Sequence, residues 1–109
     1  SYRDWGHSYD YVRAMHLMMQ HDKPGDWVVS TMKTHSVREM CDVVFNHLGL
    51  NYKDYIEQNP KFMRPEELPY LKGDSTKIRK ELGWVPTYTF KGMMEEMTDH
   101  WLEYFKKRL

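Results

Sequence analysis

The chain has 109 residues, and its 16 Lys and Arg balance its 16 Asp and Glu, so the formal net charge at pH 7 is zero. Hydrophobic residues make up 40% and charged residues 29%, a composition typical of one globular domain and too apolar for disorder. A balanced charge gives no electrostatic footprint for nucleic acid or an anionic membrane, and we expect neither partner.

The first predicted element is a helix over residues 9–20, with Ser8 as its cap. Its apolar residues recur with the helical period at Tyr11, Val12, Met15, Met18 and Met19. Pro24 and Gly25 then break the chain, and the β-branched stretch at 27–31 predicts a short buried strand. A lone strand leaves its edges unpaired, so we expect a very small sheet or one completed by chain that is absent here.

The stretch "HSVREMCDVVFNHLG" gives the clearest helix signal. Ser36 followed three residues later by Glu39 predicts a capping box, and Gly49 predicts the end of the helix. The helix has one apolar face, made of Val37, Met40, Val43, Val44 and Leu48. Residues 50–73 are irregular because Pro60, Pro65 and Pro69 forbid a long helix or a central strand. In this region we expect a helical turn near Tyr52 and extended pieces near 55–57 and 62–64.

Two more helices complete the prediction. One starts at a cap on Asp74 or Ser75 and ends at Gly83, and the other follows a cap on Thr89 and covers residues 90–107. The inner face of the last helix is expected to contain Met93, Met94, Met97, Trp101 and Tyr104. The nine methionines and the high aromatic content fit a core of large side chains, with part of them facing another domain as the alternative. The expected class is α/β and rich in helix, with about four helices and two or three short strands.

The residue pattern argues against a self-contained catalytic or metal site. The six histidines are scattered, and neither HExxH nor CxxC occurs. GxSxG, GxGxxG and the phosphate loop with GKT or GKS are also absent. Cys41 is the only cysteine, in an apolar helical run, so we expect a buried, inert thiol. With no apolar run near the ~18 residues of a membrane helix, the expected compartment is reducing and cytoplasmic.

Two arginines suit the binding of an anion. Arg3 stands just before the first helix and Arg64 in a loop restricted by proline, and the planar guanidinium can bind phosphate oxygens in pairs. Glu67 follows Arg64 by three residues and could accept hydrogen bonds from hydroxyl or ring N–H groups. The alternative is that Arg3 pairs with Asp4 or Asp10, and Arg64 with Glu66 or Glu67, as weak surface ion pairs.

Four stretches carry a resemblance to a known family: "RDWGHSYDYVRAMHLMMQ", "HSVREMCDVVFNHLGL", "FMRPEELPYLKGDSTKIRKELGW" and "PTYTFKGMMEEMT". In this order, over nearly the whole chain, they resemble the C-terminal part of the GDP-mannose 4,6-dehydratases, which belong to the extended short-chain dehydrogenase/reductase family. The resemblance implies that residues 1–109 are a small substrate domain, with 1–31 a helix–strand segment leading in from an absent Rossmann part. We accordingly expect that Ser1 is not a natural start.

The resemblance also assigns roles. It implies that Arg3 and Arg64 bind the diphosphate of a GDP-sugar such as GDP-mannose, and that Glu67 lies near the guanosine. The catalytic residues and the NADP site would belong to the Rossmann part, in cis or in trans, and this chain would hold neither cofactor nor catalytic group. Leu68 and Pro69 depart from the family's "RPxEVD" pattern, which bears on the geometry of that loop.

Three alternatives remain open at this stage. The chain could be the same domain of a related nucleotide-sugar epimerase or dehydratase, which would share the general layout. It could instead be a non-catalytic protein that binds GDP-sugars or pairs with a separate dehydrogenase subunit. A remnant without a ligand would show no rise in melting temperature with GDP.

Overall fold

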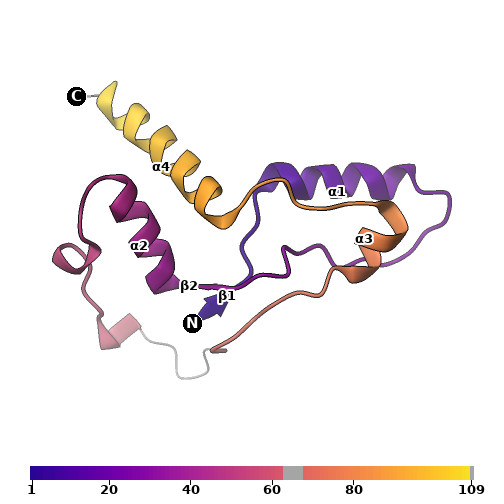
Figure 1. The fold of residues 1–109 in the computed structure, drawn as a ribbon, viewed down its shortest axis with the longest axis horizontal. Helices are drawn as coiled ribbons and strands as arrows, with labels where there is room; N and C mark the ends of the chain where they lie inside the picture. Colours follow the sequence, from indigo (N-terminus) through magenta and orange to yellow (C-terminus); the bar gives the residue numbers. More distant parts are fainter. Residues whose placement is uncertain (63–67, 109) are drawn as a thin grey trace.

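The computed structural model describes residues 1–62 and 68–108 (Figure 1). The elements in chain order are β1 (Tyr2–Arg3), α1 (Ser8–Gln20), β2 (His35–Ser36), α2 (Val37–His47), the 3-10 turns η1 (Tyr52–Asp54) and η2 (Pro60–Phe62), α3 (Thr76–Leu82) and α4 (Phe90–Lys106). The described residues therefore contain four α-helices and a two-stranded sheet, which confirms the number of helices predicted from the sequence. The two strands lie where the sequence predicted none.

Strand β1 connects parts of the chain that are distant in sequence. It pairs antiparallel with β2, with Tyr2 opposite Ser36 and Arg3 opposite His35. On its other side, the backbone N–H of Tyr2 donates to the carbonyl of Pro69 at 2.8 Å. The carbonyl of Tyr2 accepts from the N–H of Leu71 at 3.0 Å. Residues 2–3 thus lie between segments that follow about 30 and about 70 residues later.

The strand predicted at 27–31 is wrong, because these residues have no sheet partner among those described. Side chains bind the backbone here instead. The carbonyl of Ser30 accepts from the hydroxyl of Ser75 at 2.9 Å, and both Ser30 and Thr31 accept from the guanidinium of Arg79. Of the extended pieces expected, residues 55–57 do not join the sheet. In the piece expected at 62–64, Phe62 instead ends η2, and residues 63 and 64 lie outside the described residues. The β-branched composition of 27–31 indicates an extended backbone, but a strand also requires a neighbour.

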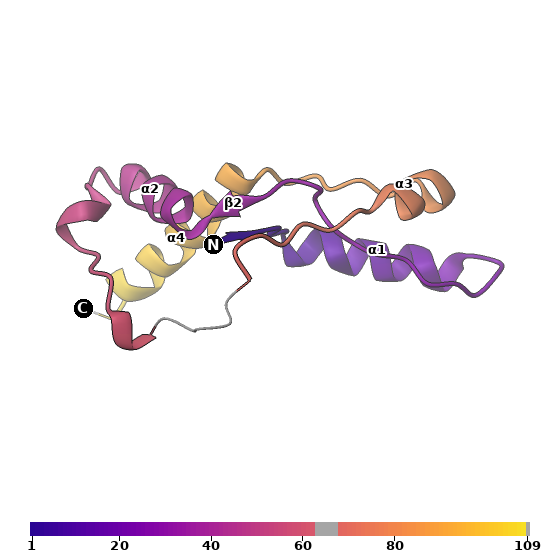
Figure 2. The same cartoon turned by 90° about the horizontal axis from the view of Figure 1, so that it is seen from below.

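The buried core is small and lies between α1 and α3. It consists of Ala14, Ile78 and Trp84, and the indole N–H of Trp84 donates to the carbonyl of Asp10 at 2.8 Å. A separate contact joins α2 to α4, where Met93 and Met94 are buried. Figures 1 and 2 show the two pairs of helices at opposite ends of the molecule, joined by extended chain.

The helix caps agree closely with the sequence. The Ser36 hydroxyl and the Glu39 carboxylate form the predicted capping box on α2, and the Thr89 hydroxyl accepts from the N–H of Gly92 at 3.0 Å. The first cap is different. Helix α1 begins at Ser8, and the Nδ1 atom of His7, rather than Ser8, accepts from the N–H of Tyr9 at 3.0 Å.

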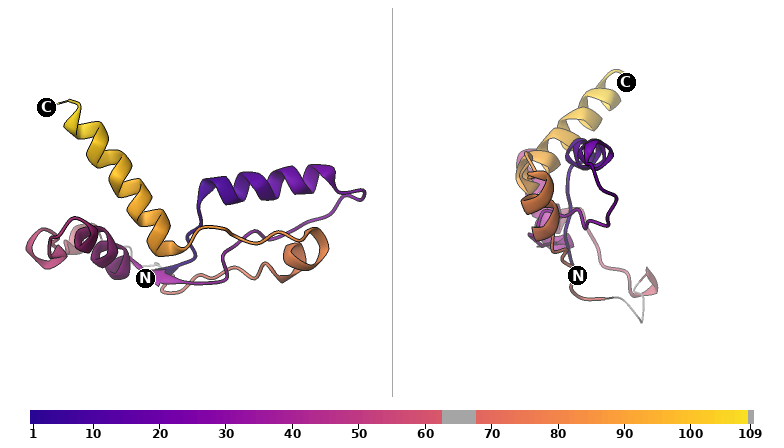
Figure 3. Two further views of the ribbon diagram at one scale, coloured as in Figure 1. Left: turned by 45° about the horizontal axis from the view of Figure 1, so that its top comes forward. Right: turned by 90° about the vertical axis from the view of Figure 1, so that its right-hand side faces the viewer.

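The molecule is elongated, and much of its apolar surface is uncovered (Figure 3). Its radius of gyration is 17.2 Å, whereas a compact domain of this length has about 13 Å. The apolar face predicted for α1 is only partly buried, since Val12, Met15 and Met19 point to solvent. The face predicted for α4 is wrong in its second half, because Met97 and Trp101 are about half exposed. Only Met93 and Met94 have enough neighbouring chain to cover them.

The carboxylate of Asp10, 1% exposed, holds the loop before α4. It accepts from the N–H and hydroxyl of Thr87 at 2.9 and 2.6 Å, from the N–H of Tyr88 at 3.1 Å and from Arg13 at 3.3 Å. Burial raises the pKa of Asp10, but these hydrogen bonds and the charge of Arg13 together outweigh it, so the pKa lies below its ordinary value.

Replacing this buried acceptor should destabilise the fold in a pH-dependent way. We expect Asp10→Asn to lower the free energy of unfolding by about 2–3 kcal/mol at pH 7, measured with urea. The folded-state pKa lies below the unfolded value of about 3.9, so the ionised carboxylate stabilises the fold above that pH. This contribution is lost as the pH falls through the folded pKa, and the difference between wild type and variant should shrink in that range. Asp22→Asn, in the exposed loop after α1, is the control. An Asp10→Asn difference that stays constant from pH 7 to pH 3 would contradict this role.

Candidate functional site

Arg3 lies on β1 and points toward the loop that precedes Tyr70. Its Nη1 atom donates to the carbonyl of Tyr2 and to that of Leu68, each at 2.8 Å. Arg64 and Glu67 lie outside the described residues. Arg3 nevertheless binds the first described residue after them, so the structure connects Arg3 to the end of the loop that carries both.

An open hollow of about 540 Å³ lies beside Arg3. It is lined by Arg3, Asp4, Trp5, Leu71, Lys72 and Gly73. Arg3 and Lys72 give this hollow two cationic side chains against one carboxylate. That carboxylate accepts hydrogen bonds from backbone groups of residues 31, 32 and 73.

The carboxylate of Asp4 fixes the backbone around the hollow. Oδ1 accepts from the N–H of Thr31 at 2.9 Å and from its hydroxyl at 2.5 Å. Oδ2 accepts from the N–H of Met32 at 3.0 Å and from that of Gly73 at 3.3 Å. Asp10, which was considered from the sequence as an ion-pair partner of Arg3, pairs with Arg13 instead. One carboxylate thus binds both the turn after residue 30 and the segment that closes the hollow.

The turn that Asp4 binds is strained. Met32 has a φ of +64°, a left-handed conformation that residues with side chains rarely adopt. The position of Gly73, whose N–H also donates to Asp4, has no room for a side chain. A Cβ atom there would lie 2.5 Å from the Cβ of Ser30, so only glycine fits without a shift of the backbone. The hydrogen bonds that Met32 and Gly73 donate to the charged carboxylate of Asp4 offset the free-energy cost of the strained turn and of the close approach at Gly73.

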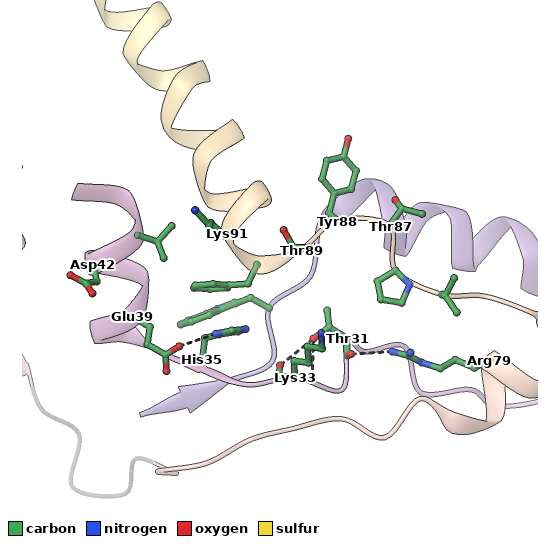
Figure 4. A pocket seen from close by; sticks show the side chains of 15 residues that line it. Thr31, Lys33, His35, Glu39, Asp42, Arg79, Thr87, Tyr88, Thr89 and Lys91 are labelled. Atoms are coloured by element: carbon green, nitrogen blue, oxygen red, sulfur yellow. Dashed lines mark hydrogen bonds and ion pairs between the residues drawn. The ribbon is translucent and has the colours of Figure 1, made fainter. Parts of the chain in front are cut away.

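A second hollow, of about 700 Å³, also has Trp5 in its lining and is drawn in Figure 4. Its lining includes stacked rings. The centroids of His35 and Phe90 are 3.9 Å apart, and those of Trp5 and Phe90 are 5.8 Å apart. Nδ1 of His35 lies 2.9 Å from Oε2 of Glu39. The hydrogen bonds from His35 and from the backbone of Ser36 hold the pKa of Glu39 below its ordinary value. These contacts fix the start of α2 against the start of α4.

The chain was compared with known proteins. The family model described as GDP-mannose 4,6 dehydratase matches residues 1–97, which end inside α4. The chain belongs to the GDP-mannose 4,6-dehydratase family. It is 46% identical over 105 residues to GDP-mannose 4,6 dehydratase 1 of Arabidopsis thaliana, which covers 96% of this chain and 29% of the relative. It therefore spans less than a third of the length of that relative.

Solved structures agree on the fold. RMD from Pseudomonas aeruginosa, complexed with NADPH, superimposes with a TM-score of 0.82 at 20% identity, over 94% of this chain and 33% of that one. WbmG from Bordetella bronchiseptica, in complex with NAD and UDP, gives 0.78 at 26% identity, over 95% of this chain and 33% of that one. The chain therefore has the arrangement of about one third of these larger proteins.

The site contains residues that sequence reasoning did not single out. Asp4 was noted only as a possible partner of Arg3, because its actual partners lie 27 to 69 residues away. Lys72 and His35 carried no separate signal either. Within residues 1–62 and 68–108, no group of three His, Cys, Asp or Glu side chains could hold a metal ion. No helix in the same ranges is long and apolar enough to cross a membrane.

The Asp4 contacts can be tested directly. Asp4→Asn removes a charged acceptor from Thr31, Met32 and Gly73, so we expect about 2–3 kcal/mol lower stability. The backbone amides of Met32 and Gly73 should exchange their hydrogens faster in this variant, as measured by NMR. Asp54→Asn, on an exposed turn, is the matched control. Unchanged protection of both amides would show that Asp4 does not hold the two segments.

Proposed function

We propose that this chain is the GDP-sugar-binding portion of a GDP-mannose 4,6-dehydratase, an enzyme that converts GDP-mannose to GDP-4-keto-6-deoxymannose. The observation that carries the proposal is the bond from Arg3 to the carbonyl of Leu68 beside a cationic hollow. In this proposal the hollow receives the diphosphate, and the loop that ends at Leu68 supplies Arg64 and Glu67.

Chain geometry supports the convergence of the two arginines. Four residues of extended chain span at most about 14 Å, so the peptide link to Leu68 limits how far Arg64 can lie from Arg3. An arginine side chain is long enough to bridge much of that distance. Two guanidinium groups and Lys72 would neutralise a diphosphate, since arginine binds phosphate oxygens in pairs. Glu67 would accept a hydrogen bond from the guanosine. The complex of WbmG with UDP shows a nucleoside diphosphate bound by a protein of the same fold.

A Rossmann part, in cis or in trans, is the second partner in this proposal. The exposed stripe on α1 supports it, since Val12, Met15 and Met19 form an apolar surface that needs a cover. The extended residues 27–31 next to it have no sheet partner among the described residues and could pair with a strand of that partner. NADP would then bind to the Rossmann part. The present 109 residues contain no glycine-rich fingerprint for it, and we assign no catalytic step to them.

A reducing, cytoplasmic location completes the proposal. Cys41 is a free thiol that is only partly buried, and such thiols persist where disulfides do not form. The sugar nucleotide and the NADP that the proposed reaction needs are consistent with that compartment.

The proposal predicts weak but specific binding of GDP. Charge-assisted hydrogen bonds are worth ~1.5–3 kcal/mol each, so Arg64→Ala should weaken the affinity for GDP about tenfold or more, measured by isothermal titration calorimetry. Arg64→Lys keeps the charge but not the paired donors, and should bind with intermediate affinity.

Arg38→Ala is the control, because this exposed arginine of α2 does not line the hollow beside Arg3. It should leave the affinity for GDP unchanged. Equal affinities of wild type and Arg64→Ala would remove Arg64 from the site, and the absence of GDP binding at millimolar concentration would remove the site itself.

A further inference from the structure

The imidazole of His7 lies where the start of α1 meets α4, between the two ends of the molecule (Figures 1 and 3). Its Nδ1 atom accepts from the N–H of Tyr9 at 3.0 Å, and its Nε2 atom lies 3.0 Å from Oε1 of Glu96. Its ring is stacked on that of Tyr88, with the centroids 3.8 Å apart, and its side chain is 15% exposed. One ring therefore contacts α1, α4 and the loop before α4.

The partners of the two ring nitrogens determine which form of His7 fits this position. A nitrogen that accepts from a backbone N–H carries no proton, so the neutral ring has its proton on Nε2 and donates it to Glu96. A protonated ring would turn Nδ1 into a donor that faces the N–H of Tyr9. It would also place a positive charge at the start of α1, where the helix dipole disfavours it. The contact with Glu96 is compatible with both forms, but the cap of α1 requires the neutral one.

The charges around the ring do not remove this requirement. Among the described residues, the ionisable side chains that bond to or stack on the ring are Glu96 of α4 and Tyr88 of the loop before it. On α1, the carboxylate of Asp10 is hydrogen-bonded to the loop and to Arg13 instead. Glu96 is about half exposed, so water screens much of its attraction for a protonated ring. We therefore expect protonation of His7 to weaken the cap of α1.

The segment between β1 and α1 is held at both ends. The carboxylate of Asp4 holds the first end, and the imidazole of His7 holds the second. Between them, the indole of Trp5 lines the hollow beside Arg3, and its ring lies 5.8 Å from that of Phe90, the first residue of α4. The placement of this indole therefore depends on both ends of the segment.

We propose that His7 is a positioning residue. In its neutral form it fixes α4 against α1 and keeps the indole of Trp5 in the wall of the hollow beside Arg3. Its effect on ligand binding rests on the proposed function of that hollow. Histidine is the side chain whose ordinary charge change falls between about pH 5 and 8. Because the neutral form makes the cap, the link between α1 and α4 weakens as the pH falls through this range.

NMR tests the cap without any ligand. At about pH 8 the ring nitrogens of His7 should show the Nε2–H form, and the amide signal of Tyr9 should follow the titration of the ring down to about pH 5. His7→Ala should make this amide exchange its hydrogen faster. His7→Asn should keep it protected at both pH values, since asparagine is a strong N-cap and does not titrate. His100→Asn, at an exposed histidine of α4, is the matched control. A Tyr9 amide that responds neither to pH nor to His7→Ala would overturn the proposal.

Residual dipolar couplings of the backbone amides test the link between the helices. At about pH 8, α1 and α4 should share one alignment frame. Glu96→Ala removes the contact of His7 with α4 and should reduce the couplings of α4 relative to those of α1. Glu103→Ala, at an exposed residue farther along α4, should leave them unchanged. Unchanged couplings in Glu96→Ala would show that His7 does not hold α4.

Calorimetric titration with GDP tests the effect on the hollow. The phosphates of GDP also gain protons in acid, so variants are compared with the wild type at the same pH. At about pH 8, His7→Ala should bind GDP several-fold more weakly than the wild type, and His7→Asn should keep most of the affinity. At about pH 5.5 the wild type should fall several-fold below His7→Asn. Parallel pH profiles of these two proteins would overturn the positioning role. If the wild type binds no GDP at any pH, the proposed function fails, while the NMR results still decide the link between the helices.

Discussion

The carboxylate of Asp4 is the contact on which the arrangement of this chain depends. Its two oxygens accept hydrogen bonds from residues 31 and 32 and from residue 73. Strand β1, on which Arg3 lies, is therefore fixed between the segment that leads to α2 and the segment that leads to α3. The strained φ of Met32 and the tight fit of Gly73 are held by the same group. The backbone bonds of Tyr2 to Pro69 and Leu71 and the bond from Arg3 to Leu68 join the same strand to the chain at 68–71.

The rest of the molecule is built outward from this frame with little internal packing. Among residues 1–62 and 68–108, only a few side chains are fully buried, and the two pairs of helices lie at opposite ends. Such a shape leaves apolar surfaces on both α1 and α4. The cover proposed for α1 is a Rossmann part.

The sequence predicted the features that depend on neighbouring residues and missed those that depend on distant ones. The capping box of Ser36 and Glu39 and the cap at Thr89 are local signals, so the starts of α2 and α4 were predicted correctly. The strand at 27–31 was wrong, because β-branched residues specify an extended backbone but not a partner. The role of Asp4 could not be predicted, since its partners are brought to it only by the fold. The resemblance to a family located Arg3 and the loop of Arg64, which spacing alone left as possible surface ion pairs.

A crystal structure of the chain soaked with GDP would test the central claim most directly. The account predicts one bound nucleotide whose diphosphate oxygens contact the guanidinium groups of both Arg3 and Arg64 in the hollow beside Lys72. A nucleotide bound elsewhere, or one that contacts Arg3 while Arg64 lies on the opposite flank of the molecule, would contradict it.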